Sequence, residues 1–167
     1  TSATADNNTI IFTTLSDATY SNCTLYVTSS SGKKGNALSV TPFTVDATAP
    51  TLSQATAVTS PTNSTTPSYA FSSNEAGTIS YGGSCSSGTT SASSGTNSIS
   101  FNTLSEGSYS NCTITVTDSA GNASSALSVN TFVVDTTAPI LSEVTPVTSP
   151  STETTPSYVF SSNDSGT

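Results

Sequence analysis

The sequence predicts an all-β fold, arranged as tandem β-sandwiches of about seven strands each. Ser and Thr supply 70 of the 167 residues, and these side chains are unfavourable in helices but fit the exposed faces of strands. Short apolar runs with a period of two alternate with turn residues, which is typical of β-sandwiches. The motif SNCT at residues 21–24 recurs at residues 110–113, an offset of 110 − 21 = 89 residues. A fixed period of this size indicates stacked modules.

A recurring linker divides the chain. VDATAP at residues 45–50 recurs as VDTTAP at residues 134–139, again 134 − 45 = 89 residues apart. We therefore expect a partial repeat with the C-terminal strands at residues 1–46, a complete repeat at residues 47–135, and a partial repeat with the N-terminal strands at residues 136–167. Modules in such arrays usually serve reach, display or assembly.

The complete repeat begins with two predicted strands on either side of a turn. The first strand is expected at residues 52–59 and the second at residues 68–72, where aromatic residues alternate with small ones. Pro61 and Pro67 bracket a polar turn between these strands, because proline cannot donate to a central ladder.

The third strand is predicted at residues 78–85. Its odd-numbered residues share one face, and they are Ile79, Tyr81, Gly83 and Cys85. Residues 86–96 are almost wholly Ser, Thr and Gly, so they are expected to form a loop or a weak edge strand. Ile99 and Phe101 then supply core residues in a strand at residues 97–102.

Two strands joined by a hairpin turn at residues 118–122 complete the repeat. Tyr109 precedes the sixth strand. The inward residues of the sixth and last strands are expected to be Cys112, Ile114, Val116, Leu127, Val129, Phe132 and Val134. The step from Val129 to Phe132 breaks the period of two, so we expect a β-bulge near Asn130.

Tyr109, shortly before Cys112 in the sixth strand of seven, resembles the tyrosine corner of an immunoglobulin-like (Ig-like) sandwich. More narrowly, the VDTTAP linker at residues 134–139, the NEAG loop at residues 74–77 and the TDSAGN hairpin at residues 117–122 resemble the tandem bacterial Ig-like repeats of large surface adhesins. The resemblance implies an extracellular location, a tandem arrangement and no catalytic activity.

In the topology that this resemblance implies, Cys85 and Cys112 lie on neighbouring antiparallel strands and both face inward. We expect a disulfide between them, which closes a loop of 112 − 85 = 27 residues and contributes about 3–4 kcal/mol to stability. The alternative is a pair of buried free thiols in a cytosolic protein. A zinc site is less suitable, because the chain has no His and too few Cys. Cys23 occupies the repeat position of Cys112, and its partner is left open.

The resemblance also places several oxygen ligands at the pole of the sandwich that receives the incoming linker. They are Asp46 from the linker, Glu75 from one loop, and Asp118 with Asn122 from the hairpin. Loop carboxylates and amides are the ligands that Ca²⁺ prefers, so this set is a candidate interdomain calcium site. The alternative is turn chemistry, in which Asp118 and Asn122 favour a tight turn and Asp46 caps or solvates the linker.

The other copies repeat this set incompletely. Asp135 and Asp164 supply part of it at the next junction, with Asp164 keeping the charge of Glu75. In the hairpin of the first copy, Ser29 and Lys33 stand where the complete repeat has an aspartate and an asparagine. A cation site that uses this first hairpin is not expected, so the joints differ from copy to copy.

The composition excludes several functional classes. Two Lys, no Arg and ten acidic residues give a net charge of −8, which repels a phosphate backbone and disfavours nucleic-acid binding. There is no His to activate a serine. Glu75 and Glu106 are expected at opposite poles, too far apart for the paired carboxylates of a glycosidase. We therefore expect no enzyme, and no membrane insertion in this segment, because no apolar stretch approaches roughly 20 residues.

The interpretation that fits best is a structural stalk or filament segment of a secreted or cell-surface protein, supporting adhesion or extracellular assembly. Its partners would be neighbouring repeats of the same chain and, in a fibre, identical chains. Residues 135–167 of one chain and residues 1–46 of another could build a composite sandwich, although a longer continuous chain is the simpler account. The alternative function is an accessory carbohydrate- or ligand-binding module, for which Tyr26 is the tyrosine expected to face outward.

Overall fold

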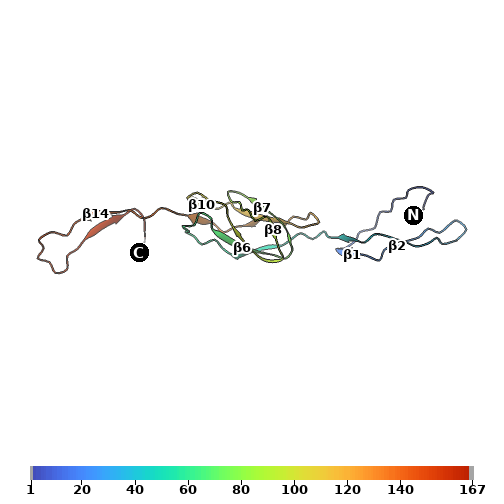
Figure 1. The fold of residues 1–167 in the computed structure, drawn as a ribbon, viewed down its shortest axis with the longest axis horizontal. Helices are drawn as coiled ribbons and strands as arrows, with labels where there is room; N and C mark the ends of the chain where they lie inside the picture. Colours follow the sequence, from blue (N-terminus) through green and yellow to red (C-terminus); the bar gives the residue numbers. More distant parts are fainter. Residues whose placement is uncertain (1, 166–167) are drawn as a thin grey trace.

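The computed structural model describes residues 2–165, and the ends of the two predicted partial repeats, residues 1 and 166–167, lie outside this range. The described chain contains strands and no helix, which confirms the predicted all-β fold. It therefore has no helix long and apolar enough to cross a membrane. Figure 1 shows a complete sandwich in the middle of an extended chain, with a smaller β unit on either side.

The first sheet of the complete module has three strands in the order β5-β6-β9. These are β5 (Leu52–Thr56), β6 (Ser68–Ser73) and β9 (Gly95–Ser100). All the pairings are antiparallel, with Tyr69 of β6 opposite Ile99 of β9. These strands correspond to the first, second and fifth strands predicted from the alternating pattern.

The second sheet has four strands in the order β12-β11-β7-β8. These are β7 (Gly77–Gly82), β8 (Ser91–Ala92), β11 (Thr113–Thr117) and β12 (Leu127–Ser128). The segment predicted as a loop or weak edge strand forms the two-residue edge strand β8 together with the loops that flank it. Beyond β11 and β12, β10 (Gly107–Tyr109) pairs with β13 (Phe132–Val134).

The bulge predicted near Asn130 is wrong. Tyr109 lies opposite Phe132, and Thr113 lies opposite Ser128. The two pairs are separated by the same step on both strands, 113 − 109 = 4 and 132 − 128 = 4 residues, so no extra residue is inserted. The regular ladder is interrupted on both strands at the same place, and the inward face changes by one residue on both. The sequence of a single strand shows only a broken period of two, which looks the same as a bulge.

The first strand is shorter than predicted and changes sheets. A register shift between Gln54 and Thr56 ends the pairing of β5 with β6. The chain continues through buried Val58, whose amide donates to Asn130 Oδ1 (2.9 Å) and whose carbonyl accepts from Asn130 Nδ2 (3.0 Å). An asparagine of the last strand segment thus satisfies the backbone where the first strand leaves its ladder.

Thr62 then ties the start of the module to its end. It forms a parallel bridge with Val134, in which the Thr62 amide donates to the Val133 carbonyl (2.9 Å) and the Asp135 amide donates to the Thr62 carbonyl (2.9 Å). The sequence pattern predicted only a polar turn here. A single hydroxyl residue paired through its backbone leaves no apolar period to detect.

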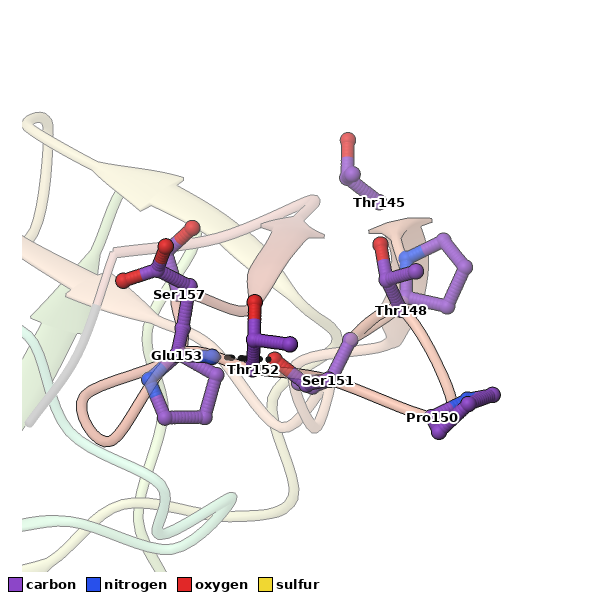
Figure 2. A pocket seen from close by; sticks show the side chains of 10 residues that line it. Thr145, Thr148, Pro150, Ser151, Thr152, Glu153 and Ser157 are labelled. Carbon is purple, nitrogen blue, oxygen red and sulfur yellow. Dashed lines mark hydrogen bonds between the residues drawn. The ribbon is translucent and has the colours of Figure 1, made fainter.

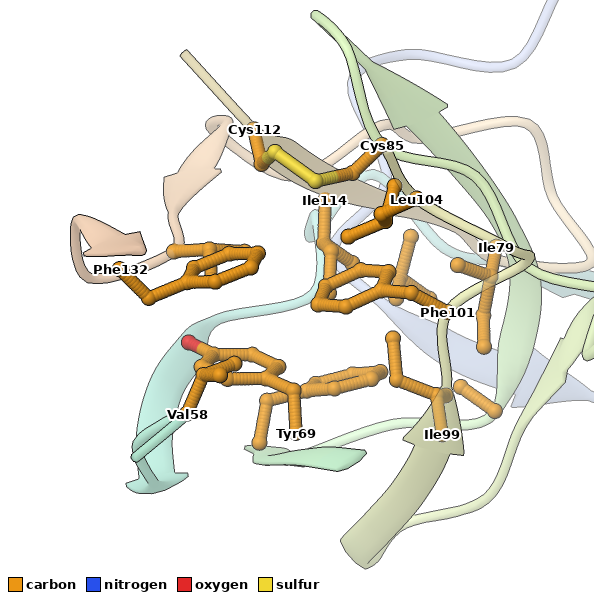
Figure 3. Close-up of a cluster of buried hydrophobic side chains, with 14 of the residues drawn as sticks. Val58, Tyr69, Ile79, Cys85, Ile99, Phe101, Leu104, Cys112, Ile114 and Phe132 are labelled. Carbon is orange, nitrogen blue, oxygen red and sulfur yellow. A yellow bond between two sulfur atoms is a disulfide. The ribbon is translucent and has the colours of Figure 1, made fainter. Parts of the chain in front are cut away.

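The core lies between the two sheets and contains most of the residues predicted to face inward. Tyr81 and Leu127 are only partly buried. Gly83 is exposed, because β7 ends at Gly82 and Gly83 turns the chain with a φ of 74°. Its largest fully buried side chains, each under 2% exposed, are Tyr69, Phe71, Phe101, Phe132, Ile114, Val116 and Val134. The Phe101 ring stacks between Tyr69 and Phe132, at centroid distances of 6.3 and 6.1 Å (Figure 3). Tyr69 lies on the first sheet and Phe132 on the β10–β13 pair across from it, so burial of these rings holds the two layers together.

The predicted tyrosine corner is present. The Tyr109 hydroxyl donates to the Ser105 carbonyl at 2.9 Å, and the Tyr109 ring packs on Phe132 with centroids 5.2 Å apart. The first copy repeats the bond, because the Tyr20 hydroxyl donates to the Ser16 carbonyl at 2.9 Å. The corner fixes the turn directly before β10 in the complete module and the equivalent turn before Tyr20 in the first copy.

The flanking units repeat the pairings of the complete module. The first contains β1 (Ala18–Tyr20), β2 (Thr24–Leu25), β3 (Leu38–Ser39) and β4 (Phe43–Val45), with β1 paired to β4 and β2 to β3. The last contains β14 (Leu141–Thr145) and β15 (Val159–Ser162), with a register shift between Glu143 and Thr145 that matches the one in β5. The peptide bonds before Pro61 and Pro150 are both cis.

Candidate functional site: the joints between modules

The incoming linker of the complete module is held by side chains of that module. Asn122 Nδ2 donates to the Asp46 carbonyl (3.2 Å). Asn74 makes two hydrogen bonds with Thr51. Its side-chain Oδ1 accepts from the Thr51 backbone amide (2.6 Å), and its backbone amide donates to the Thr51 carbonyl (3.2 Å). Pro50, between these contacts, is buried. The linker therefore enters the module along a fixed path.

The unit before the linker also holds it. Asp17 Oδ1 accepts from the Ala47 amide (3.0 Å), and Asp17 Oδ2 accepts from the Thr48 hydroxyl. Asp46 adds a local turn, since its Oδ1 accepts from the Thr48 amide (3.2 Å). The first joint is thus hydrogen-bonded to the units on both sides of it.

The second joint repeats this arrangement with a longer acid. Glu106 occupies the repeat position of Asp17, 106 − 17 = 89, and its Oε2 accepts from the hydroxyls of Thr136 (3.1 Å) and Thr137 (2.7 Å). These hydrogen bonds, the one from Thr137 first, lower the pKa of Glu106 below its ordinary value, because they favour the ionised form.

On the far side of the second joint, Asn163 repeats the part of Asn74. Asn163 Oδ1 accepts from the Ile140 amide (2.6 Å), and the Asn163 amide donates to the Ile140 carbonyl (3.3 Å). Each joint therefore has an acidic residue before the linker and an asparagine after it.

Three carboxylates converge at the first joint. Asp46, Glu75 and Asp118 each place an oxygen within 4.8 Å of the others, and all three are partly buried. Asp46 comes from the linker, Glu75 from the β6–β7 loop and Asp118 from the β11–β12 hairpin. The Ser73 hydroxyl positions the backbone of the β6–β7 loop by donating to the Glu75 carbonyl (2.6 Å). The fourth residue of the predicted set, Asn122, donates to Asp118 Oδ2 (2.9 Å).

Asp118 makes the hydrogen bonds of a turn residue. Its Oδ1 accepts from the amides of Ala120 (2.8 Å), Gly121 (2.8 Å) and Asn122 (2.9 Å). The pKa of Asp118 is lowered, first by the Asn122 side chain and then by these amides, which oppose the effect of partial burial. Turn chemistry, the alternative weighed from the sequence, is therefore present at this hairpin.

The hairpin of the first copy keeps the turn but lacks the carboxylate. In the described chain, Ser29 Oγ accepts a hydrogen bond from one backbone amide, that of Lys33 (3.1 Å). Beside it, Lys34 Nζ lies 3.5 Å from the centroid of the Tyr26 ring. Tyr26 is 53% exposed, and this cation occupies one face of the ring that the ligand-binding alternative would use.

The acids of the second joint are not gathered in the same way. Within residues 2–165, Asp135 and Asp164 belong to no group of three carboxylates. Both border one pocket together with Glu106. Asp135 Oδ1 accepts from the Thr137 amide (3.1 Å), which repeats the linker turn of the first joint.

The predicted disulfide is confirmed. Cys85 and Cys112 are bonded, with Cα atoms 5.2 Å apart, and both are buried. Figure 3 shows the bond covering one end of the aromatic core. Cys23 is the one free cysteine in the described part of the chain and is partly exposed.

A second pocket lies in the last unit and is formed by a single loop (Figure 2). It is lined by residues 145–157 with gaps, and the Glu153 amide donates to Ser151 Oγ (3.1 Å) across it. In the complete module the corresponding loop carries Thr62, which pairs with Val134. The pocket is thus an exposed surface of this loop, and Glu153 is the one titratable side chain among the residues that line it.

The sequence interpretation missed the two acids that hold the linkers. It considered Glu106 only in the argument against a glycosidase, which expected Glu75 and Glu106 at opposite poles. The structure does place Glu75 beside the incoming linker and Glu106 beside the outgoing one. The detectable signal was an acidic residue at the same repeat position in both copies, Asp17 and Glu106. The sequence around an exposed acidic residue in a turn does not indicate that it binds a residue thirty positions away.

A two-sheet sandwich with a tyrosine corner and an intersheet core defines an Ig-like module. A family model described as Bacterial Ig-like domain matches residues 39–136, and the chain belongs to this family. Comparison with curated proteins and with solved structures found no match.

Proposed function

We propose that this chain is a stalk or filament segment of a bacterial surface protein, built from tandem Ig-like modules and supporting adhesion or extracellular assembly. The observation that carries the proposal is the placement of the two linkers. The incoming linker is bound beside Glu75 and Asp118, and the outgoing linker is bound by Glu106 at the other end of the module (Figure 1). Modules connected through opposite ends extend in line and add length.

The surface of the complete module suits this role. Its apolar side chains are gathered in one core, and its outward strand positions are mostly Ser and Thr, as in the hydroxyl pair Ser53 and Ser72 (2.7 Å). Such a surface is soluble without a high charge density and offers no large apolar patch for aggregation.

Small-angle scattering of the full chain tests the proposed shape. A maximum dimension much larger than that of a globular protein of 16.7 kDa is expected, together with the pair-distance profile of a rod. A compact, symmetric profile would contradict the stalk role, because the linkers would then fold the units back on each other.

An extracellular location forms part of the proposal. Membership of the bacterial Ig-like family supports it, and so does the Cys85–Cys112 disulfide, since disulfides persist in oxidising compartments. Antibodies against the complete module should label intact cells of the organism that makes it. Labelling only after permeabilisation would place the protein inside the cell and remove the stalk role.

We also propose that Ca²⁺ binds Asp46, Glu75 and Asp118 at the first joint. Three carboxylates within 4.8 Å of one another repel, and a divalent cation would relieve the repulsion. Calcium should slow hydrogen exchange of the amides at residues 46–51 in the full chain, relative to chelator, and Glu75→Gln should remove the effect. Equal exchange in calcium and chelator would overturn this ligand assignment. Glu153→Gln, on the distant loop of the last unit, is the matched control.

A further inference from the structure

We infer that the acidic residue of the tyrosine-corner turn, Asp17 in the first joint and Glu106 in the second, is the positioning residue that sets the direction in which the next module leaves. The inference deepens the proposed stalk function, because a rod needs joints of fixed angle. It assigns this task to hydrogen bonds made within the chain, separately from any bound ion.

The geometry at Glu106 carries the argument. One oxygen, Oε2, accepts from the Thr136 amide (3.4 Å), the Thr136 hydroxyl (3.1 Å) and the Thr137 hydroxyl (2.7 Å). Both threonines follow the last strand, which ends at Val134. The carboxylate therefore holds the first residues that lie outside the sandwich, and hydrogen bonds to an ionised acceptor are stronger than neutral ones.

The first joint makes the same connection with a different side chain. Asp17 accepts from the Ala47 amide and the Thr48 hydroxyl, which are the repeat counterparts of Thr136 and Thr137. The shorter acid spreads these bonds over both of its oxygens, whereas Glu106 uses one. Since the contact persists through a change of side-chain length, two independent cases support it.

The turn that presents the acid is itself anchored. The Tyr109 hydroxyl binds the Ser105 carbonyl, directly before Glu106, and Gly107 directly after it begins β10, which pairs with β13. Glu106 is thus fixed on both sides by the sandwich. A carboxylate fixed in this way can orient the linker, because the carboxylate does not move when the linker moves.

The rest of the linker has little freedom. In the first joint, Thr48 is held by Asp17 and Thr51 is held by Asn74. Only Ala49 and Pro50 lie between them, and proline fixes one of the backbone torsions. Removing the acid should therefore release Ala47 and Thr48 from the preceding unit, while Asn74 keeps Thr51 attached to the following module.

Distance measurements between two spin labels in the full chain test the inference. One label is placed at Ser119 on the hairpin of the complete module and the other at Ser161 in β15, in a Cys23→Ser background, since all three sites are away from the core. The parent chain should give a narrow distance distribution. Glu106→Ala should broaden it, and Thr136 amide exchange should become faster.

Two variants separate positioning from general acidity. Glu106→Asp should restore the narrow distribution, because the first joint uses aspartate at this position, whereas Glu143→Ala, a change of an exposed acid in β14, should leave it unchanged. An unchanged width for Glu106→Ala would overturn the inference. So would broadening that comes with a lower melting temperature of the complete module, since the cause would then be unfolding.

This outcome is distinct from failure of the stalk proposal. Insensitivity to Glu106→Ala with an extended scattering profile removes the positioning role and keeps the rod. A compact scattering profile with a broadened distribution in Glu106→Ala removes the rod and keeps the positioning role.

Discussion

The interior of the complete module and its joints are held by different kinds of interaction. In the interior, Phe101 and its aromatic neighbours are removed from water between the sheets, and the disulfide closes one end. At the joints, Glu106 and Asp17 act from exposed positions through directional bonds to hydroxyls and amides. Apolar burial tolerates changes of pH and salt, whereas charged contacts do not. The interior therefore decides whether the module folds, and the joints decide its orientation.

The repeat copies show that these two parts vary independently. Tyr20 and Tyr109 make the same corner bond, yet the hairpin that faces the preceding joint changes from Asp118 to Ser29. The carboxylate accepts from three backbone amides where the hydroxyl accepts from one. A surface turn can lose these bonds without disturbing the core, so the joints are free to differ.

Truncation of a central ring should have the largest effect on the interior. Phe132 is fully buried against Phe101 and Tyr109, so Phe132→Ala should lower the free energy of unfolding by about 3–5 kcal/mol. Urea unfolding of the full chain, monitored by hydrogen exchange of the β11 amides, measures this loss of stability. Val133→Ala, on the outward face of the same strand, should have little effect. Equal losses in the two variants would show that burial does not distinguish these positions.

Loss of the disulfide should come next. Replacing Cys85 and Cys112 together by alanine should lower the free energy of unfolding by about 3–4 kcal/mol, because the unfolded chain regains the entropy of the open loop. Cys23→Ala is the matched control and should leave the complete module unchanged. Chemical denaturation of both variants makes the comparison, and a double variant as stable as the parent would refute the role assigned to the bond.

A smaller and pH-dependent effect is expected at the hairpin. Asp118→Ser reproduces the first copy and should destabilise the β11–β12 hairpin at neutral pH. Because the folded-state pKa of Asp118 is lowered, its stabilisation is complete above its ordinary pKa of about 4 and is lost as the pH falls through the lowered folded value. The stability difference between parent and variant should therefore shrink below about pH 4. A difference that is constant with pH would contradict the charge-based account.

The smallest effect should be a gain in stability. Tyr69 is 1% exposed, and its hydroxyl finds no hydrogen-bond partner in the described chain; burial also raises the pKa of this phenol. Tyr69→Phe removes an unpaired buried polar group and should stabilise the module by up to about 1 kcal/mol. Tyr109→Phe, which loses the bond to Ser105, should instead destabilise it. Thermal unfolding of both variants tests the contrast, and destabilisation by Tyr69→Phe would indicate a partner for this hydroxyl.

Much of the interior could be predicted because it depends on local periodicity. Alternation placed Tyr69, Phe71, Ile114 and Val116 on buried faces. The pairing of the two cysteines followed from the Ig-like topology that the resemblance implied, and the structure contains this bond. The errors fell where pairing overrides the pattern. Thr62 pairs through its backbone alone, and the irregularity near Asn130 involves two strands at once.

The candidate site was predictable only in part. The sequence placed Asp46, Glu75 and Asp118 at one pole because the Ig-like topology assigns their loops to it, and the structure brings these three together. It gave no indication that Glu106 holds Thr137, since the contact joins two exposed polar segments that share no pattern.

By itself, the sequence determined the all-β fold, the repeat and most of the inward faces, because side-chain alternation and repeat spacing are properties of the chain. Only the tertiary structure decided how the modules are joined. The carboxylates of Asp17 and Glu106 bind linker residues about thirty positions away in the sequence. Which polar groups meet in such contacts depends on where the folded strands place the chain, and the order of polar residues in the sequence does not show it.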